Sequence, residues 1–361
     1  MQKKNFKNKD EYYQYLSLAN RNDDPFGILS NIYDNTFPHP FFDPNKIGFY
    51  KYRNYDHQQY SVRNTLPNKS IVFEDFEQYV PCKGDVSHGL FPDQKLMPLT
   101  DHDYIITSCI SSNDHKWPVP YVYNNWHFVK THEVNKNLQF EQLDTRRYFA
   151  DVLLGNAKSH RTIFFELLRE NNMLSENIIH LFGVYKSDYI KTVNDKIQQS
   201  IDTALTENTN YFGTTKPLDN NFTSQYISKP IVENSWFSVV AETICGSDTD
   251  CFFVTEKTAK PLMAGRPFIM LGAPYTLKHL QNLGFRTFDP VINENYDMIT
   301  NEKERVKAAF ESFRELSKQN PLKITQKLTD VLQHNREIMY NKQKLTQKAR
   351  NFLDDILLKH L

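Results

Sequence analysis

Cysteines are scarce in this sequence, and their scarcity excludes one class of protein. Four cysteines, Cys82, Cys109, Cys245 and Cys251, are too few in a chain of 361 residues for a disulfide-stabilised scaffold. None of them belongs to a Cys-x-x-Cys pair, so we expect no zinc site. We expect no bound cofactor either. We interpret all four as reduced thiols in a cytoplasmic protein.

Long apolar segments are also absent. The strongest apolar run, residues 267–272, has the length of a strand and is far shorter than the ~20 residues of a membrane span. The first ten residues carry positive charge without an apolar segment behind them, so we expect no secretory signal there. We therefore expect no association with a membrane.

Charge of one sign is not in excess, because 43 Lys and Arg residues balance 43 Asp and Glu residues. This balance argues against a polybasic nucleic-acid coat protein and against an acidic solvating tail, but it permits a local basic groove. What the sequence does have is aromatic side chains, 20 Tyr and 26 Phe, which are enough to build real cores. At about 150 residues per domain, the length predicts a little over two domains.

Short β-branched or aromatic runs begin at about residue 46. They cover residues 47–52, 70–76, 104–109 and 121–128, and polar segments separate them. Their spacing of roughly 20–30 residues leaves room for crossover connections, which favours a parallel sheet over a meander.

A second series of alternating strands and helices begins near residue 146. We expect strands at 148–154, 178–185, 236–242 and 267–272, a strand-like segment at 285–288, and helices at 161–171, 194–205, from Thr255, at 277–283, 301–318 and 322–360. Two such series predict an α/β chain with two Rossmann-like domains. We place an extension at 1–45, the N-terminal domain at 46–145, the C-terminal domain at 146–340 and a final helix at 341–361.

The most informative segment is the helix expected after the strand that ends at Glu242. Thr255 is a natural N-cap and Gly265 a natural end for this helix. The free N–H groups and the dipole at its start favour a phosphate, and Lys257 adds positive charge there. Glu256 can accept hydrogen bonds from sugar hydroxyls. The alternative interpretation is a capped surface helix that leads into a core strand.

Three motifs within this region carry a resemblance to a known family. They are Ala241-Glu242-Thr243, Phe253-Val254-Thr255-Glu256-Lys257 and Ala264-Gly265-Arg266-Pro267-Phe268. Their order resembles the donor-binding domain of GT-B glycosyltransferases, above all α1,3-fucosyltransferases and glycosyltransferases encoded in bacteriophage and other viral genomes. Two departures, Thr243 where the family has Asn and Phe253 where it has Tyr, leave the nucleotide and the sugar open.

Looser likenesses extend over residues 70–300, at 70–77, 121–128 and 155–161. The resemblance implies two Rossmann-like domains that face a cleft, with the final helix packed back on the N-terminal domain. It further implies transfer of a sugar from a nucleotide-diphosphate-sugar to an acceptor hydroxyl, with inversion and without a metal.

Seven residues are the expected donor-binding set under this resemblance. Arg161, Lys158 and Lys257 would stabilise the departing diphosphate, Glu242 and Glu256 would bind donor hydroxyls, and Phe253 and Thr255 complete the motif. The alternative for Arg161 and Lys158 is an ordinary surface ion pair.

Three residues are candidates for the general base that takes the acceptor proton. Asp75 and Glu77 are two residues apart, so strand geometry places them on the same side of the sheet, at or just beyond the carboxyl end of the strand. His127 belongs to the aromatic run at 121–128. The alternatives are a loop or helix-capping carboxylate for Glu77 and a buried core histidine for His127.

The acceptor stays open at this stage. The viral side of the resemblance suggests a hydroxymethylated base in DNA, and the fucosyltransferase side suggests a glycan. A different class of function also fits, namely a catalytically inactive nucleotide- or glycan-binding module with the same fold. The sequence does not indicate an oligomeric state.

Overall fold

The computed structural model describes residues 47–52, 70–75, 104–107, 110–111, 121–123, 126–140, 145–156, 158–182, 224–246 and 251–359. For 47–52, 70–75, 105, 107, 110–111, 121, 156, 181–182, 251, 357 and 359 it describes the backbone alone. The chain forms two compact units. Unit 1 combines Met1–Trp126 with Gln343–Leu361, and unit 2 is the continuous segment His127–Lys342.

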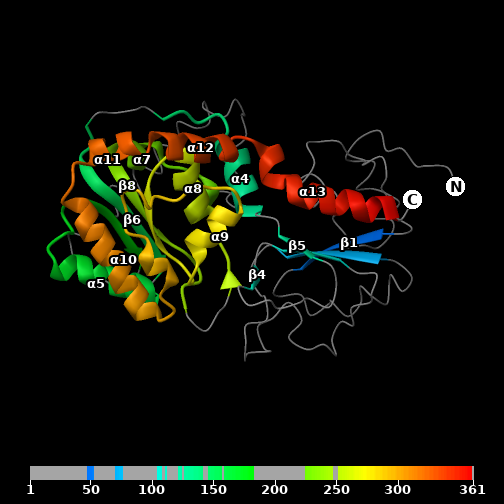
Figure 1. Ribbon diagram of the computed structural model, residues 1–361, viewed down its shortest axis with the longest axis horizontal. Helices are drawn as coiled ribbons and strands as arrows, with labels where there is room; N and C mark the ends of the chain where they lie inside the picture. Colours follow the sequence, from blue (N-terminus) through cyan, green and yellow to red (C-terminus); the bar gives the residue numbers. More distant parts are fainter. Residues whose placement is uncertain are drawn as a thin grey trace. The chain divides into compact units, whose positions relative to one another are not determined.

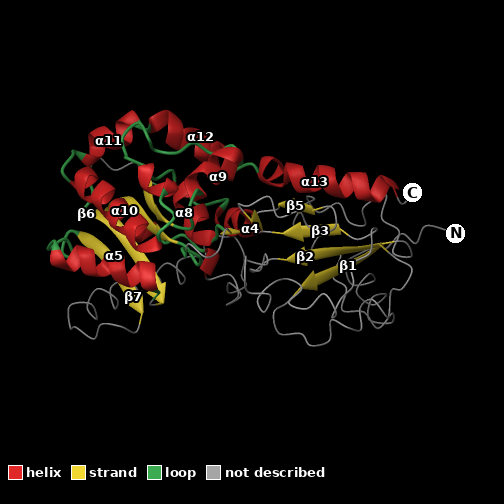
Figure 2. Cartoon of the chain, turned by 60° about the horizontal axis from the view of Figure 1, so that its bottom comes forward, coloured by secondary structure: helices red, strands yellow, loops and turns green. Residues whose placement is uncertain are grey.

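Unit 1 contains a parallel sheet. Its strands are β1 (Ile47–Tyr52), β2 (Ser70–Asp75), β3 (Tyr104–Thr107) and β5 (Tyr121–Tyr123), in the spatial order β1-β2-β3-β5 (Figure 2). The two-residue strand β4 is Ile110–Ser111. Helix α13 (Lys342–Lys359) belongs to this unit from Gln343 onward. The rings of Phe352 in α13 and Tyr104 in β3 meet edge to face with their centroids 6.1 Å apart.

Unit 2 is built on a second parallel sheet. Its strands are β6 (Tyr148–Asn156), β7 (Asn177–Phe182), β8 (Ser235–Ala241) and β10 (Phe268–Leu271), in the order β10-β8-β6-β7. Every residue of β8 and β10 is buried, because a parallel sheet is covered on both faces. The short strand β9 is Cys251–Phe252.

Helices cover both faces of this second sheet (Figure 1). They are α4 (Trp126–Asn135), α5 (Ser159–Glu170), α7 (Lys229–Asn234), α8 (Glu256–Ala264), α9 (Thr276–Asn282), α10 (Glu302–Ser317), α11 (Pro321–Lys327) and α12 (Thr329–Met339), with a 3₁₀ turn, η2, at Asn295–Met298. Helix α5 packs against α10, and α8 packs against α12. The chain leaves β6 toward β7 on one side and later leaves β8 toward β10 on the other. Right-handed crossovers then place α5 and α8 on opposite faces.

Aromatic side chains form the core between the sheet of unit 2 and the α5–α10 layer. The ring of Phe164 in α5 lies 5.7 Å from those of Phe310 and Phe313 in α10, both edge to face. All three side chains are at most 1% exposed. The phenylalanine-rich composition is therefore used for packing, as the sequence analysis expected.

The α/β class and the two Rossmann-like parallel sheets are confirmed. The two units divide between Trp126 and His127, whereas the sequence analysis set the boundary at residues 145 and 146. Helix α4 accounts for the difference, because its side chains bond within unit 2. Thr131 Oγ1 donates to Gln225 Oε1 at 2.8 Å, and His132 Nδ1 lies 2.8 Å from the carbonyl oxygen of Met339. The cleft expected between the two domains stays a prediction.

The strand expected at 121–123 is confirmed, but its expected extension to residue 128 is wrong. Strand β5 ends at Tyr123, and helix α4 begins at Trp126. His127 therefore lies in the first turn of a helix. The helix has no polar face to reveal it in the sequence, because three consecutive residues, 127–129, and then Thr131 and His132 are all buried.

Two predictions for the C-terminal part of the chain also need correction. Residues 285–288 are not a strand, because side chains satisfy their backbone: Arg286 N donates to Asn335 Oδ1 at 2.8 Å, and Phe288 N donates to Glu294 Oε1 at 2.7 Å. The helical segment expected at 322–360, with a separate final helix from residue 341, consists of three helices, α11, α12 and α13. The helix expected at 194–205 lies outside the described residues.

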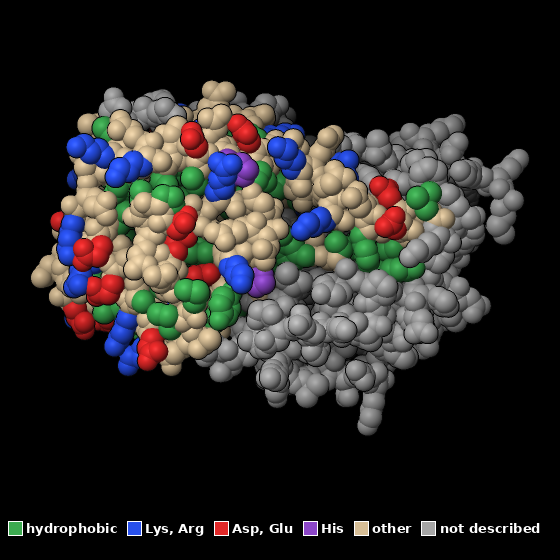
Figure 3. Space-filling view, viewed as in Figure 1, with side chains coloured by type: hydrophobic (Ala, Val, Ile, Leu, Met, Phe, Trp, Pro, Cys, Tyr) green, Lys and Arg blue, Asp and Glu red, His purple; other side chains and the backbone are tan. Residues whose placement is uncertain are grey.

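Acidic and basic side chains alternate over the surface of unit 2 that Figure 3 presents, in keeping with the zero net charge. No helix within the described residues is both long and apolar enough to cross a membrane.

Candidate functional site

The sheet of unit 2 reverses its direction of winding between β6 and β8. At such a switch point the connections from neighbouring strands diverge to opposite faces, which leaves a crevice beyond the carboxyl ends of the two strands. Here those ends are Asn156 of β6 and Ala241 of β8. The residues that follow each strand therefore define the candidate site.

Gly155 is the last but one residue of β6, directly before the connection to α5, and its backbone has a φ of +65°. A Cβ atom at Gly155 would lie 3.5 Å from Nη1 of Arg161, so the turn passes directly over this guanidinium. Glycine adopts the left-handed conformation without strain. The turn brings Lys158 to the N-cap of α5, and Ser159, His160 and Arg161 into its first turn.

Arg161 ties the start of α5 to the end of β8. Its Nη2 donates to the carbonyl oxygens of Ala241 and Glu242, both at 3.0 Å, and the side chain is only 4% exposed. Burial lowers the pKa of Arg161, while the carboxylate of Glu242 opposes that shift. The guanidinium thus places positive charge just beneath the surface of the crevice.

His160 is a structural residue in this turn. Its Nε2 lies 3.0 Å from the carbonyl oxygen of Glu242, and this acceptor requires the Nε2–H tautomer. Burial, followed by the charge of Arg161, lowers the pKa of His160 to about 3, so the ring is neutral at physiological pH.

Three cations, Lys158, Arg161 and Lys257, lie around residues 241–243. They are here named the cation cluster. Lys158 Nζ donates to the carbonyl oxygen of Thr243 at 2.7 Å, and Lys257 Nζ lies 3.4 Å from Thr243 Oγ1. Partial burial and the charges of Arg161 and Lys257 lower the pKa of Lys158. The three residues expected to stabilise a departing diphosphate therefore all lie against one three-residue segment.

Glu242 supports the start of α8 from below. Its side chain is fully buried, and its two oxygens accept four hydrogen bonds: from Thr255 N at 2.9 Å, Thr255 Oγ1 at 2.7 Å, Thr258 Oγ1 at 2.5 Å and Thr243 N at 3.2 Å. Four bonds occupy the lone pairs of a carboxylate. Glu242 therefore holds the loop and the helix in place, and no oxygen of it is left for a ligand.

Thr255 is the N-cap of α8, as the sequence predicted. Its hydroxyl oxygen accepts from Lys257 N at 3.3 Å and donates its own proton to Glu242. An internal carboxylate thus already lies at the positive end of α8.

Helix α5 differs in this respect. No described side chain caps its N-terminus, and its first turn contains no acidic residue. The free N–H groups beside the cation cluster are therefore those of α5, which moves the favoured anion position from the start of α8 to the start of α5.

Glu256 and Lys257 form an ion pair at the rim of the crevice, with Nζ and Oε1 2.9 Å apart. Burial alone would raise the pKa of Glu256, but Lys257, Lys260 and His127 outweigh it and lower the pKa to about 2. Glu256 is therefore ionised across the physiological range and acts as a hydrogen-bond acceptor.

His127 joins the same region from α4. Its Nδ1 lies 3.5 Å from Oε2 of Glu256 and 3.3 Å from Nε2 of Gln225, and its ring meets that of Phe253 edge to face at 5.7 Å. His127 is 6% exposed and Phe253 4%. Phe253 thus packs behind the ion pair instead of presenting its ring to a ligand.

A cavity of about 280 Å³ opens beside Glu256 and Lys257 on the α8 face of the sheet. Lys260 lines it, and at its floor Arg266 Nη1 forms an ion pair with Asp151 at 2.9 Å. Sequence reasoning missed the contribution of Asp151. The available signal was a charged residue in the middle of an apolar strand.

The other two candidates for the general base, Asp75 and Glu77, belong to unit 1. Asp75 is the last residue of β2, where only the backbone is described, and Glu77 lies outside the described residues. Within the described parts of the chain, no group of three or more His, Cys, Asp or Glu side chains is arranged to hold a metal ion.

No protein-family model matches the chain, and no curated protein matches it. Among solved structures it is similar to a UDP-forming α,α-trehalose-phosphate synthase from Burkholderia xenovorans, with 11% identity over 97% of this chain and 79% of that chain and a TM-score of 0.44.

Proposed function

We propose that the chain is a GT-B-type glycosyltransferase that moves a sugar from a nucleotide-diphosphate-sugar to an acceptor hydroxyl. One observation carries the proposal: Lys158, Arg161 and Lys257 surround residues 241–243 at the switch point, beside the uncapped start of α5. A diphosphate is the anion that suits several fixed cations and a row of free N–H groups.

The chemistry requires these charges at one moment of the reaction. The acceptor oxygen attacks the anomeric carbon, the bond from that carbon to the β-phosphate oxygen breaks, and its electron pair leaves on the diphosphate. The acceptor proton passes to a general base. Lys158, Lys257 and the dipole of α5 stabilise the negative charge that develops on the diphosphate, and Arg161 supports them from beneath.

The 280 Å³ cavity beside the cluster is the proposed position for part of the donor. Ionised Glu256 accepts hydrogen bonds from sugar or ribose hydroxyls there, and Lys260 on the next turn of α8 faces the same space. Glu242, Thr255 and Phe253 are proposed as positioning residues that hold this arrangement. Such preorganisation matters because charges that are already fixed need no reorganisation during the reaction.

The general base, the acceptor and the inverting outcome are further parts of the proposal. His127 is the candidate that contacts the donor side, through Glu256, while Asp75 and Glu77 remain candidates from unit 1. The proposed acceptor is a glycan or a hydroxymethylated base in DNA. Binding of modified duplex that weakens steeply with salt would identify DNA, because phosphate contacts release counterions.

Removal of a cluster cation tests the proposal directly. In a thermal-shift screen of UDP-, GDP-, ADP-, CMP- and dTDP-sugars, we expect at least one donor to raise the melting temperature, since a ligand at 100 times its Kd adds roughly 2.7 kcal/mol of stability. We expect Lys158→Ala and Lys257→Ala each to weaken the binding of that donor about tenfold or more, because each removes a charge-assisted hydrogen bond to the diphosphate.

The matched control is Lys303→Ala, which removes an exposed lysine of α10 and should leave donor binding unchanged. The proposal is wrong if no donor binds, or if Lys158→Ala and Lys257→Ala bind the donor as tightly as Lys303→Ala and the parent protein do. Donor binding without sugar transfer to any acceptor would instead favour the inactive binding module.

A further inference from the structure

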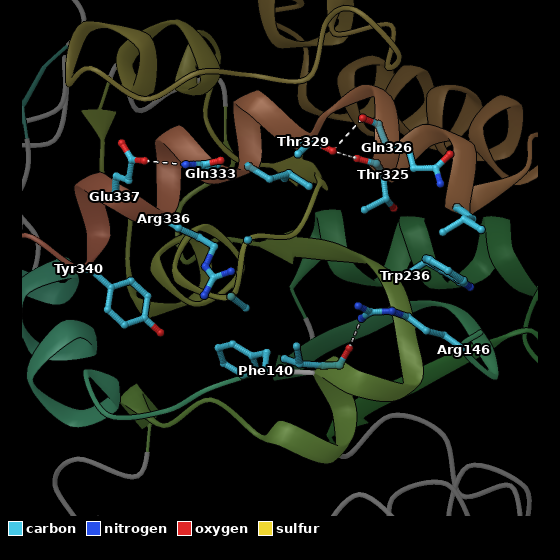
Figure 4. A pocket seen from close by; sticks show the side chains of 15 residues that line it. Phe140, Arg146, Trp236, Thr325, Gln326, Thr329, Gln333, Arg336, Glu337 and Tyr340 are labelled. Atoms are coloured by element: carbon cyan, nitrogen blue, oxygen red, sulfur yellow. Dashed lines mark hydrogen bonds between the residues drawn. The ribbon is translucent and has the colours of Figure 1, made fainter. Parts of the chain in front are cut away.

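A second, larger cavity of about 630 Å³ lies near the amino ends of β6 and β8 in the unit 2 sheet. Arg146, which precedes β6, and Trp236, near the start of β8, line one wall, and the end of α8 at Ala264 and Gly265 lines another. Helices α11 and α12 form the remaining side (Figure 4). The cation cluster lies beyond the carboxyl ends of the same strands, roughly 20 Å away along a seven-residue strand.

Two arginines face each other across this cavity (Figure 4). Arg146 Nη1 donates to the carbonyl oxygens of Val232 at 2.5 Å and Ser235 at 2.8 Å, which fixes the guanidinium, and the guanidinium lies 5.2 Å from the centroid of Trp236. Burial, and then the charge of Arg266, lowers the pKa of Arg146 to about 10, so the group remains charged at neutral pH. Among the described residues, no carboxylate pairs with Arg146 within 4.0 Å.

Arg336 of α12 is held in place from the other side. A Cβ atom at Gly265 would lie only 2.4 Å from Cδ of Arg336, so the arginine stem runs directly over the end of α8. Its guanidinium lies 5.8 Å from the ring centroid of Tyr340. In the described part of the chain no carboxylate lies within salt-bridge distance of Arg336. The neighbouring Glu337 also lines the cavity and accepts from Gln333 Nε2 at 3.0 Å.

The remaining lining groups suit a hydroxyl-bearing ring. Phe140 and Tyr340 supply aromatic surface, and Thr325, Thr329 and Gln326 supply hydroxyl and amide groups (Figure 4). Sugar rings pack their C–H faces on aromatic rings, while their hydroxyls bond to such polar side chains. The volume lies within the range of about 300–1,000 Å³ of small-ligand sites.

We propose that this cavity is a second ligand site, distinct from the donor site, that binds a phosphorylated sugar. Arg336 and Arg146 clamp the phosphate from opposite sides, and the aromatic and hydroxyl-bearing wall receives the ring. Guanidinium N–H groups form strong, charge-assisted hydrogen bonds to phosphate oxygens, and neither arginine forms a salt bridge with a described carboxylate.

Calorimetric titration of the full chain with glucose 6-phosphate tests this proposal, with glucose and inorganic phosphate as separate arms. We expect saturable binding of the sugar phosphate that is at least tenfold tighter than that of either component, because both halves of the cavity contribute. Arg336→Gln should weaken binding tenfold or more, and the matched control Arg314→Gln, which removes an arginine of α10 outside the cavity, should not.

A cavity-filling variant keeps the test independent of Arg336. Thr329 is exposed at the rim, so Thr329→Phe should fold normally and still abolish binding. Lys257→Ala should leave sugar-phosphate binding intact, because Lys257 lies at the carboxyl ends of the strands, away from this cavity. The proposal is overturned if the chain does not bind the sugar phosphate, if Arg336→Gln and Thr329→Phe bind it like the parent, or if only Lys257→Ala loses it.

Discussion

A single buried carboxylate organises the candidate site at the residue scale. Glu242 carries a charge into a fully buried position, which is unfavourable unless hydrogen bonds compensate for the lost water. Four donors compensate here, and three of them come from Thr255 and Thr258 at the start of α8. The position of Lys257 therefore depends on Glu242, although Glu242 faces no ligand.

The substitution Glu242→Gln tests this positioning role. Glutamine replaces one acceptor oxygen with an NH₂ group that faces hydroxyl and N–H donors, so we expect the free energy of unfolding to fall by about 1–3 kcal/mol. Urea denaturation measures the change. Glu315→Gln, at a side chain 61% exposed, is the matched control and should stay within about 0.5 kcal/mol of the parent. Equal stability of the two variants would contradict the role assigned to Glu242.

Helix α8 connects the two proposed sites at the element scale. It begins at the Glu242–Thr255 arrangement beside the cation cluster, and it ends at Gly265, whose backbone is left-handed with φ 66° and ψ 51°. The backbone N–H of Gly265 bonds to the carbonyl oxygen of Leu262, which closes the last turn. Any residue with a side chain at Gly265 would meet both an unfavourable conformation and the stem of Arg336.

We therefore expect Gly265→Ala to destabilise the protein by at least about 1 kcal/mol, the usual cost of a left-handed conformation for a residue with Cβ. Displacement of Arg336 should add to this loss and weaken sugar-phosphate binding. Thermal unfolding provides the measurement. Gly246→Ala is the matched control, because its backbone φ is not in the left-handed region and its Cβ would lie 3.6 Å from the nearest atom, Oε2 of Glu302. Comparable losses in both variants would show that Gly265 has no special role.

Elements with local signals could be predicted from the sequence, and elements defined by distant partners could not. The bounds of α8 follow from its capping residues, Thr255 and Gly265. Helix α4 gave no periodic signal because it is buried on several sides, and residues 285–288 resembled a strand because Phe285 and Phe288 are core residues. Their backbone partners, Asn335 and Glu294, are invisible to a local pattern.

The candidate site divides in the same way. The approach of Lys158, Arg161 and Lys257 to one another follows from strand order, since residues after neighbouring parallel strands meet at one edge. The closed environment of Glu242 does not follow, because three of its four donors lie 13 and 16 residues further along the chain. A capping motif in a sequence shows where a helix starts, but it does not show whether that start is free to bind an anion.

At the scale of the whole molecule, the end of the chain completes its first unit. Unit 1 includes Gln343–Leu361, so α13 returns to the unit in which the chain began. Leu353 and Ile356 are at most 1% exposed, while Leu358 is 52% exposed, which defines a buried and an open side of the helix. Contact between Phe352 and Tyr104 links this helix to β3 of the N-terminal sheet.

The substitution Leu353→Ala should therefore weaken unit 1 selectively. Loss of a fully buried leucine side chain typically costs about 2–5 kcal/mol, and the cost should fall on the unit that the side chain supports. Hydrogen exchange followed by mass spectrometry should show faster exchange in peptides that contain β3, with unchanged protection in those of β8 and α8, which belong to unit 2. Leu358→Ala, the same change at the exposed position, should leave both patterns unchanged. Faster exchange in β8 and α8 together with β3 would show instead that the two units unfold as one.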